Sequence, residues 1–355
     1  MKIKSIFTKL TQWEYWPTPM FYIPVLPYAF YKAIGFKSLT FFLNVNPAIK
    51  NSGDGTDSKY ETLQLAPKKH RPKSVLISVN EDFNTVKEKI NNNEISYPLI
   101  AKPDLGFRGL LVKKVDSENE LINYLHKNNS VEIIIQEYIA YPKECGIFYY
   151  RLPNNDKGKI TSITLKKFLS VFGDGKSTLS ELILADTRAF LYYELLQNIH
   201  KENMFKIPLK DEKIVLTVIG NHSKGTQFIN GNHLISKELE ATFDNLNKQM
   251  DGWFYGRLDV KYQSFEKLLK GEDYKILEIN GILAEPTHIY DASVPTSNYF
   301  TALKAIKNNW KIISLIAKQN RENHKLTSPK AINYIKQMVV LRKYSKKIIA
   351  LNDKN

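Results

Sequence analysis

The most informative part of the sequence is a pair of apolar stretches, WFYGRLDVKY at residues 253–262 and YKILEIN at residues 274–280. Each is short and rich in aromatic and branched residues, which is typical of a buried β-strand. Polar residues interrupt both stretches at alternate positions, and alternate side chains point to the same face of a strand. We therefore expect two neighbouring strands that each direct polar side chains to one face.

Four polar side chains occupy these alternate positions: Arg257 and Asp259 on the first strand, Glu278 and Asn280 on the second. Burying carboxylates without partners is costly, so a compensating charge is expected. A bound Mg²⁺ would supply it, because Mg²⁺ takes oxygen ligands and completes its octahedron with phosphates. A buried ion pair between Arg257 and Glu278 would supply it equally well, and the residue types alone leave both interpretations open.

A second polar element precedes a glycine-bearing loop. Residues 99–102 form a short apolar strand that ends at Lys102, directly before a proline. A lysine held at a strand end can bind phosphate as a point charge. Gly106 and Gly109 would let backbone N–H groups approach a ligand closely, and Arg108 could fold over a triphosphate. Taken alone this signal is weak, because a surface lysine before a proline is common.

A third element consists of Gln136, Glu137, Tyr138 and Ile139, followed by Glu144 seven residues after Glu137. A strand that leads into an extended segment exposes backbone donors and acceptors, which can recognise the edge of an adenine ring. A carboxylate further along can accept hydrogen bonds from both hydroxyls of a ribose. In isolation, an ordinary loop position for Glu144 explains the pattern better than a binding role.

The rest of the chain mixes strands and helices without a strict βαβ order, so we expect an α+β fold. Ser117 with Glu120, and Thr178 with Glu181, match the capping box that begins a helix. We expect strands at residues 74–79, 110–115, 133–139, 147–152, 159–168, 213–218 and 226–229, and helices at residues 82–90, 237–250 and 297–318.

The N-terminal part of the chain has a different composition. Residues 13–42 are crowded with aromatic residues, but four prolines interrupt them, which argues against a membrane-spanning helix. Two interpretations stay open: an aromatic cover packed on the protein, or an interfacial segment on a membrane with the basic N-terminus near lipid headgroups. Residues 46–73 are polar and turn-rich, and we expect a loop or linker there.

The overall composition excludes several classes of protein. Of 355 residues, 43% are hydrophobic and 25% charged, which supports a sizeable core and excludes global disorder. Lysine and arginine total 51 against 36 acidic residues, and the net charge of +15 favours anionic partners. Because no nucleic-acid-binding module accompanies this charge, a nucleic-acid partner is not expected. The single cysteine, Cys145, excludes an intrachain disulfide and favours a cytoplasmic protein with a buried structural thiol.

Together and in this order, these elements resemble the ATP-grasp superfamily, in particular the D-alanine–D-alanine ligase-like and cyanophycin synthetase-like carboxylate–amine ligases. The resemblance covers roughly residues 74–320. It is carried by YPLIAKP at 97–103, the glycine loop 106–109, residues 136–139, Glu144, residues 257–259, residues 278–280 and, as in the cyanophycin synthetase-like enzymes, GDGKST at 173–178.

The resemblance implies an ATP-grasp fold, in which two α+β subdomains hold ATP between them, here with an atypical aromatic and proline-rich N-terminal segment. The expected division is an N-terminal segment and linker over residues 1–73, an ATP-grasp domain over residues 74–325 and a basic C-terminal tail over residues 326–355. Within the domain, a central lid subdomain would cover about 97–170 and a C-terminal subdomain about 171–325.

The resemblance also implies a role for each polar element, with ATP and Mg²⁺ as cofactors. For the nucleotide, the expected residues are Lys102 with Lys166 or Lys167 at the phosphates, Gln136, Glu137, Tyr138 and Ile139 at adenine, and Glu144 at the ribose. Two Mg²⁺ (or Mn²⁺) ions would be held by Asp259, Glu278 and Asn280, with Glu278 bridging them. The charge of the transition state would be stabilised by Arg257, Lys102 and Arg108.

The implied activity is ATP- and Mg²⁺-dependent ligation of a carboxylate to an amine through an acyl phosphate. A kinase that phosphorylates a hydroxyl, and a non-catalytic nucleotide binder at the membrane periphery, stay as alternatives. The ligases have a serine-containing loop of Pro-Gly type where this chain has GILAEPTH at 281–288, so we do not expect D-alanine as a substrate. Residues 221–226 and 285–288, with His288, are candidate substrate contacts. A homodimer and contact with the inner face of the membrane are further hypotheses.

Overall fold

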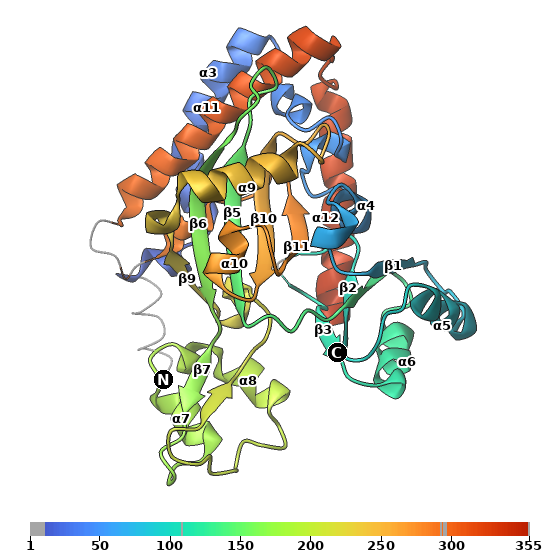
Figure 1. The fold of residues 1–355 in the computed structure, drawn as a ribbon, viewed down its shortest axis with the longest axis vertical. Coiled ribbons are helices and arrows are strands. Elements are labelled where there is room, and N and C mark those ends of the chain that lie inside the picture. Colours follow the sequence, from blue (N-terminus) through green and yellow to red (C-terminus); the bar gives the residue numbers. More distant parts are fainter. Residues whose placement is uncertain (1–10, 108, 292, 294–296, 354–355) are drawn as a thin grey trace.

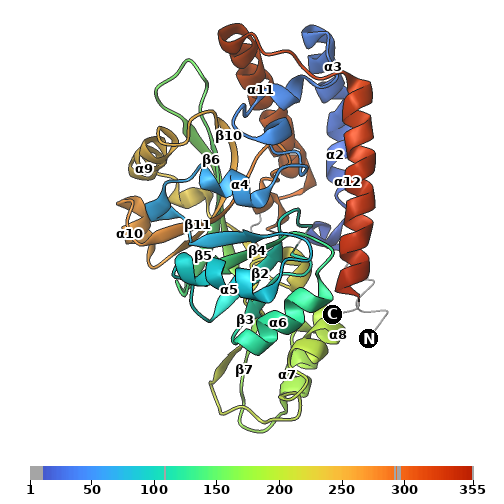
Figure 2. The ribbon, with the colours of Figure 1, turned by 90° about the vertical axis from the view of Figure 1, so that its right-hand side faces the viewer.

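The computed structural model describes residues 11–107, 109–291, 293 and 297–353. Two antiparallel sheets with their helices form the body of the molecule, and long helices cover one side of it (Figure 1, Figure 2). This mixed architecture confirms the α+β class expected from the sequence. Within the described ranges, no helix is both long and apolar enough to cross a membrane.

The smaller sheet has four strands in the order β1-β4-β2-β3, and each adjacent pair is antiparallel. Its apolar face, which includes Leu99 and Ile135, forms a core with the helices α5 and α6. Its other face carries Lys102 and Gln136, because these residues alternate with the buried ones. The bounds are β1 Ser74–Ile77, α5 Phe83–Asn92, β2 Leu99–Pro103, β3 Lys113–Val115, α6 Glu118–Lys127 and β4 Ile133–Glu137.

The larger sheet has five strands in the order β11-β10-β5-β6-β9. Cys145, Leu258 and Ile276 lie in a core that the helices α9 and α10 cover, so the single thiol is buried as expected. Polar side chains alternate onto the opposite face. The bounds are β5 Lys143–Tyr150, β6 Lys159–Lys167, β9 Gln227–Asn230, α9 Lys237–Asn247, β10 Tyr255–Tyr262, α10 Phe265–Leu269 and β11 Tyr274–Asn280.

The two sheets divide the chain differently from the boundary at about residue 170 expected from the sequence. β5 and β6, which that boundary places with the small sheet, pair with β10 and share its core, because their apolar faces continue the same buried surface. The chain passes from the small sheet to the large one over residues 138–142. A further unit with its own core contains β7 Ser170–Phe172, α7 Leu179–Ala185, α8 Tyr193–Ile199 and β8 Lys213–Val215 (Figure 1, bottom).

The N-terminal aromatic segment packs against the long helix α11 (Tyr299–His324). Phe21 is fully buried beside Tyr290 and Ile306, and Phe41 is almost fully buried. This packing agrees with an aromatic cover, while the outer side of α3 exposes Phe30 and other apolar residues. The bounds are η1 Trp13–Tyr15, α2 Pro19–Tyr22, η2 Ile23–Val25, α3 Leu26–Phe36 and η3 Phe41–Asn44.

The expected linker at residues 46–73 contains a helix, and so does the C-terminal tail. Residues 46–73 hold the short helix α4 (Lys59–Gln64), which begins where the Ser58 hydroxyl accepts a hydrogen bond from the backbone N–H of Glu61 at 3.0 Å. The basic C-terminal tail forms α12 (Ala331–Asn352), and its Ile348 is buried in the core of the small sheet.

The strand expected at residues 110–115 is shorter in the structure and begins at Lys113. Gly109 and Leu111 have φ values of +74° and +59°, which an extended strand cannot contain. These residues form turns and lengthen the glycine-bearing loop that precedes β3.

Candidate functional site

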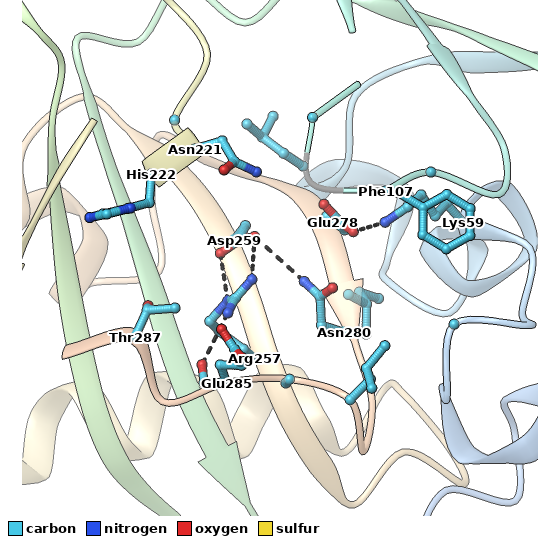
Figure 3. Close-up of a pocket in the computed structure, with 18 of the residues that line it drawn as sticks. Lys59, Phe107, Asn221, His222, Arg257, Asp259, Glu278, Asn280, Glu285 and Thr287 are labelled. Atoms are coloured by element: carbon cyan, nitrogen blue, oxygen red, sulfur yellow. Dashed lines mark hydrogen bonds and ion pairs between the residues drawn. The ribbon is translucent and has the colours of Figure 1, made fainter. Parts of the chain in front are cut away.

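A cavity of about 1030 Å³ lies between the two sheets and extends to the N-terminal segment and to α11 and α12. This volume is at the upper end of the range for ligand pockets, so the cavity can hold a nucleotide and a second small molecule. Part of its wall is the polar face of the large sheet (Figure 3).

Arg257 and Asp259 project into this cavity from β10 and face β11 (Figure 3). The strand register places Asn280 opposite Arg257 and Glu278 opposite Asp259. The Arg257 guanidinium donates hydrogen bonds to the two carboxylate oxygens of Asp259 at 3.0 and 3.2 Å, and to the backbone carbonyl of Glu285 at 3.0 Å. The ion pair considered from the sequence, Arg257 with Glu278, is therefore not the one that forms.

Asp259 also lies next to a buried lysine on β6. The Lys166 ammonium is 2.6 Å from a carboxylate oxygen of Glu144 and 3.4 Å from one of Asp259. Burial alone raises the pKa of Asp259, but Arg257 and Lys166 outweigh it and lower that pKa to about 2. Of the two candidate lysines, Lys166 lines the cavity, whereas Lys167 is exposed and does not.

Glu278 has a different partner, which the sequence analysis missed. Lys59, in the first turn of α4, forms an ion pair with Glu278 at the cavity wall (Figure 3). A signal was present: Ser58 and Glu61 have the spacing of a capping box, which would have placed Lys59 at the start of a helix. The part that could not be foreseen is the contact itself, since Lys59 and Glu278 are far apart in the sequence.

Lys102 projects from β2 toward the same region. Its ammonium donates to the side-chain oxygen of Gln136 at 3.0 Å and lies 3.4 Å from the backbone carbonyl of Leu277. Burial, together with the nearby Lys59 charge, lowers the pKa of Lys102 to about 7. Within the described chain, the buried side-chain nitrogen of Gln136 has no hydrogen-bond partner. A bound anion and a hydrogen-bond acceptor would therefore satisfy groups that the protein itself leaves unsatisfied.

The segment expected to hold adenine crosses between the sheets at the cavity. The backbone carbonyl of Ile139 accepts a hydrogen bond from Lys261 at 3.0 Å, and Lys261 also lies over the ring of Tyr138 at 5.2 Å. Glu137 lines the cavity, but its carboxylate accepts a hydrogen bond from the backbone N–H of Lys73 at 3.0 Å. The conformation of this segment is thus fixed by contacts with both sheets.

The glycine-bearing loop lies at the cavity mouth beside α4. Gly106, Phe107 and Gly109 line the cavity, and a side-chain carbon on Gly106 would lie 3.1 Å from the Lys59 side chain. Arg108, expected to act on the transition state, lies outside the described residues.

The oxygen donors of β10 and β11 fit a hard divalent cation. Asp259 and Glu278 face each other across the strand pair, and the Asn280 amide lies 3.5 Å from the Asp259 carboxylate. In the ranges that the structure describes, no three His, Cys, Asp or Glu side chains are grouped to hold a metal. A Mg²⁺ ion at these three side chains would therefore need phosphate or water oxygens to complete its octahedron.

The far end of the cavity is bounded by the loop after β11 and by the N-terminal segment. Glu14 of this segment accepts hydrogen bonds from Arg188 at 2.9 Å and from His222 at 3.1 Å. On the opposite side, the Tyr290 hydroxyl donates to the Glu285 carboxylate at 3.2 Å. These contacts join three parts of the chain that are distant in sequence.

Most of the residues proposed from the sequence as substrate contacts line this end. They are Asn221, His222, Ser223, Glu285, Pro286 and Thr287. His288 is different, because it does not line the cavity and its buried Nδ1 has no partner among the described residues. Burial lowers its pKa to about 4, so His288 is a neutral side chain in the protein interior.

The sequence matches none of the family models and none of the curated proteins compared with it. Three solved structures have a similar chain path: a bifunctional glutathione synthetase from Pasteurella multocida (17% identity, TM-score 0.39), a D-alanine–D-alanine ligase from Bacillus anthracis (14%, 0.40) and the VanG D-Ala:D-Ser ligase from Enterococcus faecalis (13%, 0.43). The matches cover 71%, 76% and 76% of this chain and 36%, 68% and 64% of the respective proteins.

The chain thus spans about a third of the glutathione synthetase and about two thirds of the other two proteins. Identities and TM-scores this low say nothing about activity, so the function is argued from the residues of this chain.

Proposed function

We propose that the protein is an ATP- and Mg²⁺-dependent ligase that joins a carboxylate to an amine through an acyl phosphate. The observation that carries this proposal is the convergence of cations and oxygen donors on one cavity with room for two ligands. The cations are Lys59, Lys102, Lys166 and Arg257, and the oxygen donors are Asp259, Glu278 and Asn280.

The nucleotide would occupy the cavity between the two sheets. Its adenine would lie along residues 136–139, where the unpartnered Gln136 nitrogen offers a donor. Lys102 and Lys166 would neutralise the phosphates, and a phosphate beside Lys102 would restore the charge that burial disfavours. Glu144, which holds Lys166 in place, lies where a ribose hydroxyl could reach it.

Asp259, Glu278 and Asn280 would hold Mg²⁺. When bound, the cation neutralises the triphosphate and stabilises the charge that develops on the transferred phosphoryl group. Lys59 already neutralises Glu278, and Arg257 and Lys166 neutralise Asp259. The side chains are thus positioned before any ligand binds, which lowers the reorganisation needed in the reaction.

The reaction follows from this arrangement of charges. A carboxylate oxygen of the acid attacks the γ-phosphorus, the bond from this phosphorus to the β,γ-bridging oxygen breaks, and ADP leaves. The amine nitrogen then attacks the acyl carbon, the carbon–oxygen bond to the phosphate breaks, and the amide, phosphate and a proton are formed. Arg257, at the junction of the two ends of the cavity, would bind the acid and stabilise the acyl phosphate.

The test is ADP release from Mg-ATP with pooled acids and with pooled hydroxyl compounds, in the presence and absence of hydroxylamine. Formation of a hydroxamate would demonstrate an acyl phosphate and identify the acid. ADP release without hydroxamate would replace the proposal with the kinase alternative, because a phosphorylated hydroxyl does not react with hydroxylamine. Nucleotide binding without turnover across all acid and hydroxyl pools would favour the non-catalytic alternative.

We also propose that this ligase is a cytoplasmic protein that contacts an anionic membrane surface. Helices α3 and α12 lie on the same side of the molecule (Figure 2, right) and expose large apolar residues, including Phe30, Ile34, Ile335 and Val340. Residues 331–352 contain five basic and no acidic residues. Basic helices with exposed apolar side chains bind anionic lipid surfaces.

Flotation with vesicles of phosphatidylserine and phosphatidylcholine tests this contact. The protein should float with these vesicles, and a much smaller fraction of it should float with neutral vesicles. A variant with Ile34→Glu and Val340→Glu should stay in solution with both. If equal fractions of the variant and the native protein floated with the anionic vesicles, the proposal would be overturned. The hypothesis of a homodimer stays a prediction that sedimentation would test.

A further inference from the structure

Aromatic rings from distant parts of the chain form part of the cavity wall. We call six of them the aromatic compartment; they come from the N-terminal segment, the loop after β11, α11 and α12 and are Trp16, Tyr22, Phe42, Tyr290, Trp310 and Tyr334. None of these six was predicted to have a role in the site. Tyr334 and Trp310 belong to helices that the sequence analysis did not connect with the cavity at all.

Three rings of the aromatic compartment pack against one another. Phe42 contacts Trp310 edge-to-face with centroids 6.0 Å apart, and Tyr334 with centroids 5.6 Å apart. Behind them, Ile306 and Ile313 of α11 are buried. Aromatic packing of this kind fixes the shape of this part of the wall before a ligand enters.

The aromatic compartment is continuous with the site proposed for the acid. Arg257 contacts the backbone carbonyl of Glu285 at its inner end. Tyr22 lies close enough to the side chains of Arg257 and Glu285 for their charges to affect the pKa of its hydroxyl. The nucleotide end lies on the other side of Arg257, along β2 and β4. An acid whose carboxylate reaches Arg257 therefore has its remaining atoms directed toward the aromatic rings.

Resting on the proposed function, we infer that the acid is amphiphilic: its carboxylate binds at Arg257, and an extended hydrocarbon or aromatic group fills the aromatic compartment. The apolar walls would stay hydrated around a small polar amino acid, whereas an apolar group removes that water. Specificity then comes from the apolar area that the acid buries, and it should rise steadily with the size of the apolar group.

A series of straight-chain acids tests the inference. Butanoate, hexanoate, octanoate and decanoate, each below its micelle concentration, are compared by hydroxamate formation with Mg-ATP and hydroxylamine. We expect kcat/KM to rise about fourfold per added methylene, as for full burial of a CH₂ group. A flat series, or a preference for butanoate, overturns the inference even if hydroxamate forms, and leaves the ligase proposal standing.

Two variants locate the effect. Trp310→Ala and Tyr334→Ala should each lower kcat/KM for decanoate at least tenfold, so that kcat/KM rises less with chain length. The KM for ATP should stay within twofold of the native value. Tyr334 lies on the peripheral helix α12, so this variant should fold even if Trp310→Ala does not. Phe300→Ala is the matched control, because Phe300 is on the same helix as Trp310 but is 77% exposed and outside the cavity. Equal losses in the control and the two variants would overturn the assignment.

Binding without turnover separates the two proposals. Titration calorimetry of decanoate and butanoate, with ADP and Mg²⁺ present, measures the aromatic compartment independently of catalysis. Tighter binding of decanoate, lost in Tyr334→Ala, with no hydroxamate from any acid, would support the compartment and refute the ligase. Equal binding of both acids would refute the compartment.

Discussion

The two ends of the cavity are built from different interactions. At the nucleotide end, charged side chains on the strands each have defined partners, such as Lys166 with Glu144 and Asp259. In the aromatic compartment, rings such as Phe42 and Trp310 are held by packing against one another. The first end depends on short, directional contacts in a buried environment, and the second on apolar area.

This difference predicts how each end responds to change. Directional contacts between buried charges fail completely when one partner is removed, because the other charge is left without compensation. Packing between rings is lost in proportion to the atoms removed. Substitutions at the nucleotide end should therefore have steep effects, and substitutions in the aromatic compartment graded ones.

The largest effect should follow removal of the Lys166 charge. Lys166→Met leaves the buried Glu144 and Asp259 carboxylates with less compensation, and the free energy of unfolding should fall by about 3–5 kcal/mol. Urea denaturation measures this change. Lys167→Met is the control, because Lys167 is exposed and its loss should cost no more than about 0.5 kcal/mol. Similar losses in the two variants would contradict the buried network.

Glu278→Gln should abolish most of the activity while the protein stays folded. The carboxylate is partly exposed and its one ion pair is with Lys59, so stability should change by less than about 1 kcal/mol. The ADP-release rate should fall by about 10²–10³-fold, as when a group that stabilises transition-state charge is removed. Glu272→Gln, an exposed carboxylate just before the same strand, should leave the rate unchanged. A rate within tenfold of the native protein would remove Glu278 from the metal site.

Affinity for ATP should depend on pH through Lys102. Burial and the Lys59 charge lower the pKa of Lys102 to about 7, and a bound phosphate would raise it again. Below pH 7 the Lys102 ammonium is already charged, so its ionisation does not make the affinity for ATP depend on pH. Above pH 7 the affinity falls by up to about tenfold per pH unit, because binding must take up a proton, until the pKa of the bound form is reached.

Calorimetry at pH 6.5, 7.5 and 8.5 measures this dependence, and two buffers with different ionisation enthalpies count the protons taken up. The Lys102→Met variant should bind ATP more weakly. Its affinity for ATP should vary with pH only through the titration of the nucleotide's own phosphate. The same pH dependence in both proteins would mean that Lys102 does not contact the phosphates.

The smallest effect should come from the Tyr22 hydroxyl in the aromatic compartment. Burial keeps this hydroxyl neutral by raising its pKa, and Tyr22 lies near Arg257 and Glu285. Tyr22→Phe should raise the KM for the acid by about two- to tenfold, the worth of a single neutral hydrogen bond. The KM for ATP should stay within twofold. A change in both constants would show that the two ends are coupled, and the comparison between them would then fail.

Much of the nucleotide end could be predicted from the sequence because its signals are local. A period of two on a strand places Asp259 beside Arg257, and a lysine at the end of an apolar run places Lys102 at a strand end. These side chains do line one cavity in the structure. The α+β class followed from the same local patterns, although β5 and β6 belong to the other sheet than expected.

The choice of partners could not be predicted. Period two puts Arg257 and Asp259 on one face of their strand and Glu278 and Asn280 on one face of theirs, but it does not say which carboxylate the guanidinium contacts. Arg257 takes Asp259 because the two side chains lie on the same face of one strand, and Lys59 reaches Glu278 from a helix more than two hundred residues earlier. Such contacts depend on how the elements pack, which strand periodicity does not contain.

The sequence by itself determined which residues carry charge toward a shared face and which class of chemistry they suit, since both follow from residue type and local geometry. The tertiary structure alone decided that Tyr22, Trp310 and Tyr334 meet in one compartment beside Arg257. Apolar area drives the burial of aromatic residues, so their sequence pattern indicates burial and not location. Only the packing of the N-terminal segment, α11 and α12 around one cavity makes them a candidate binding site.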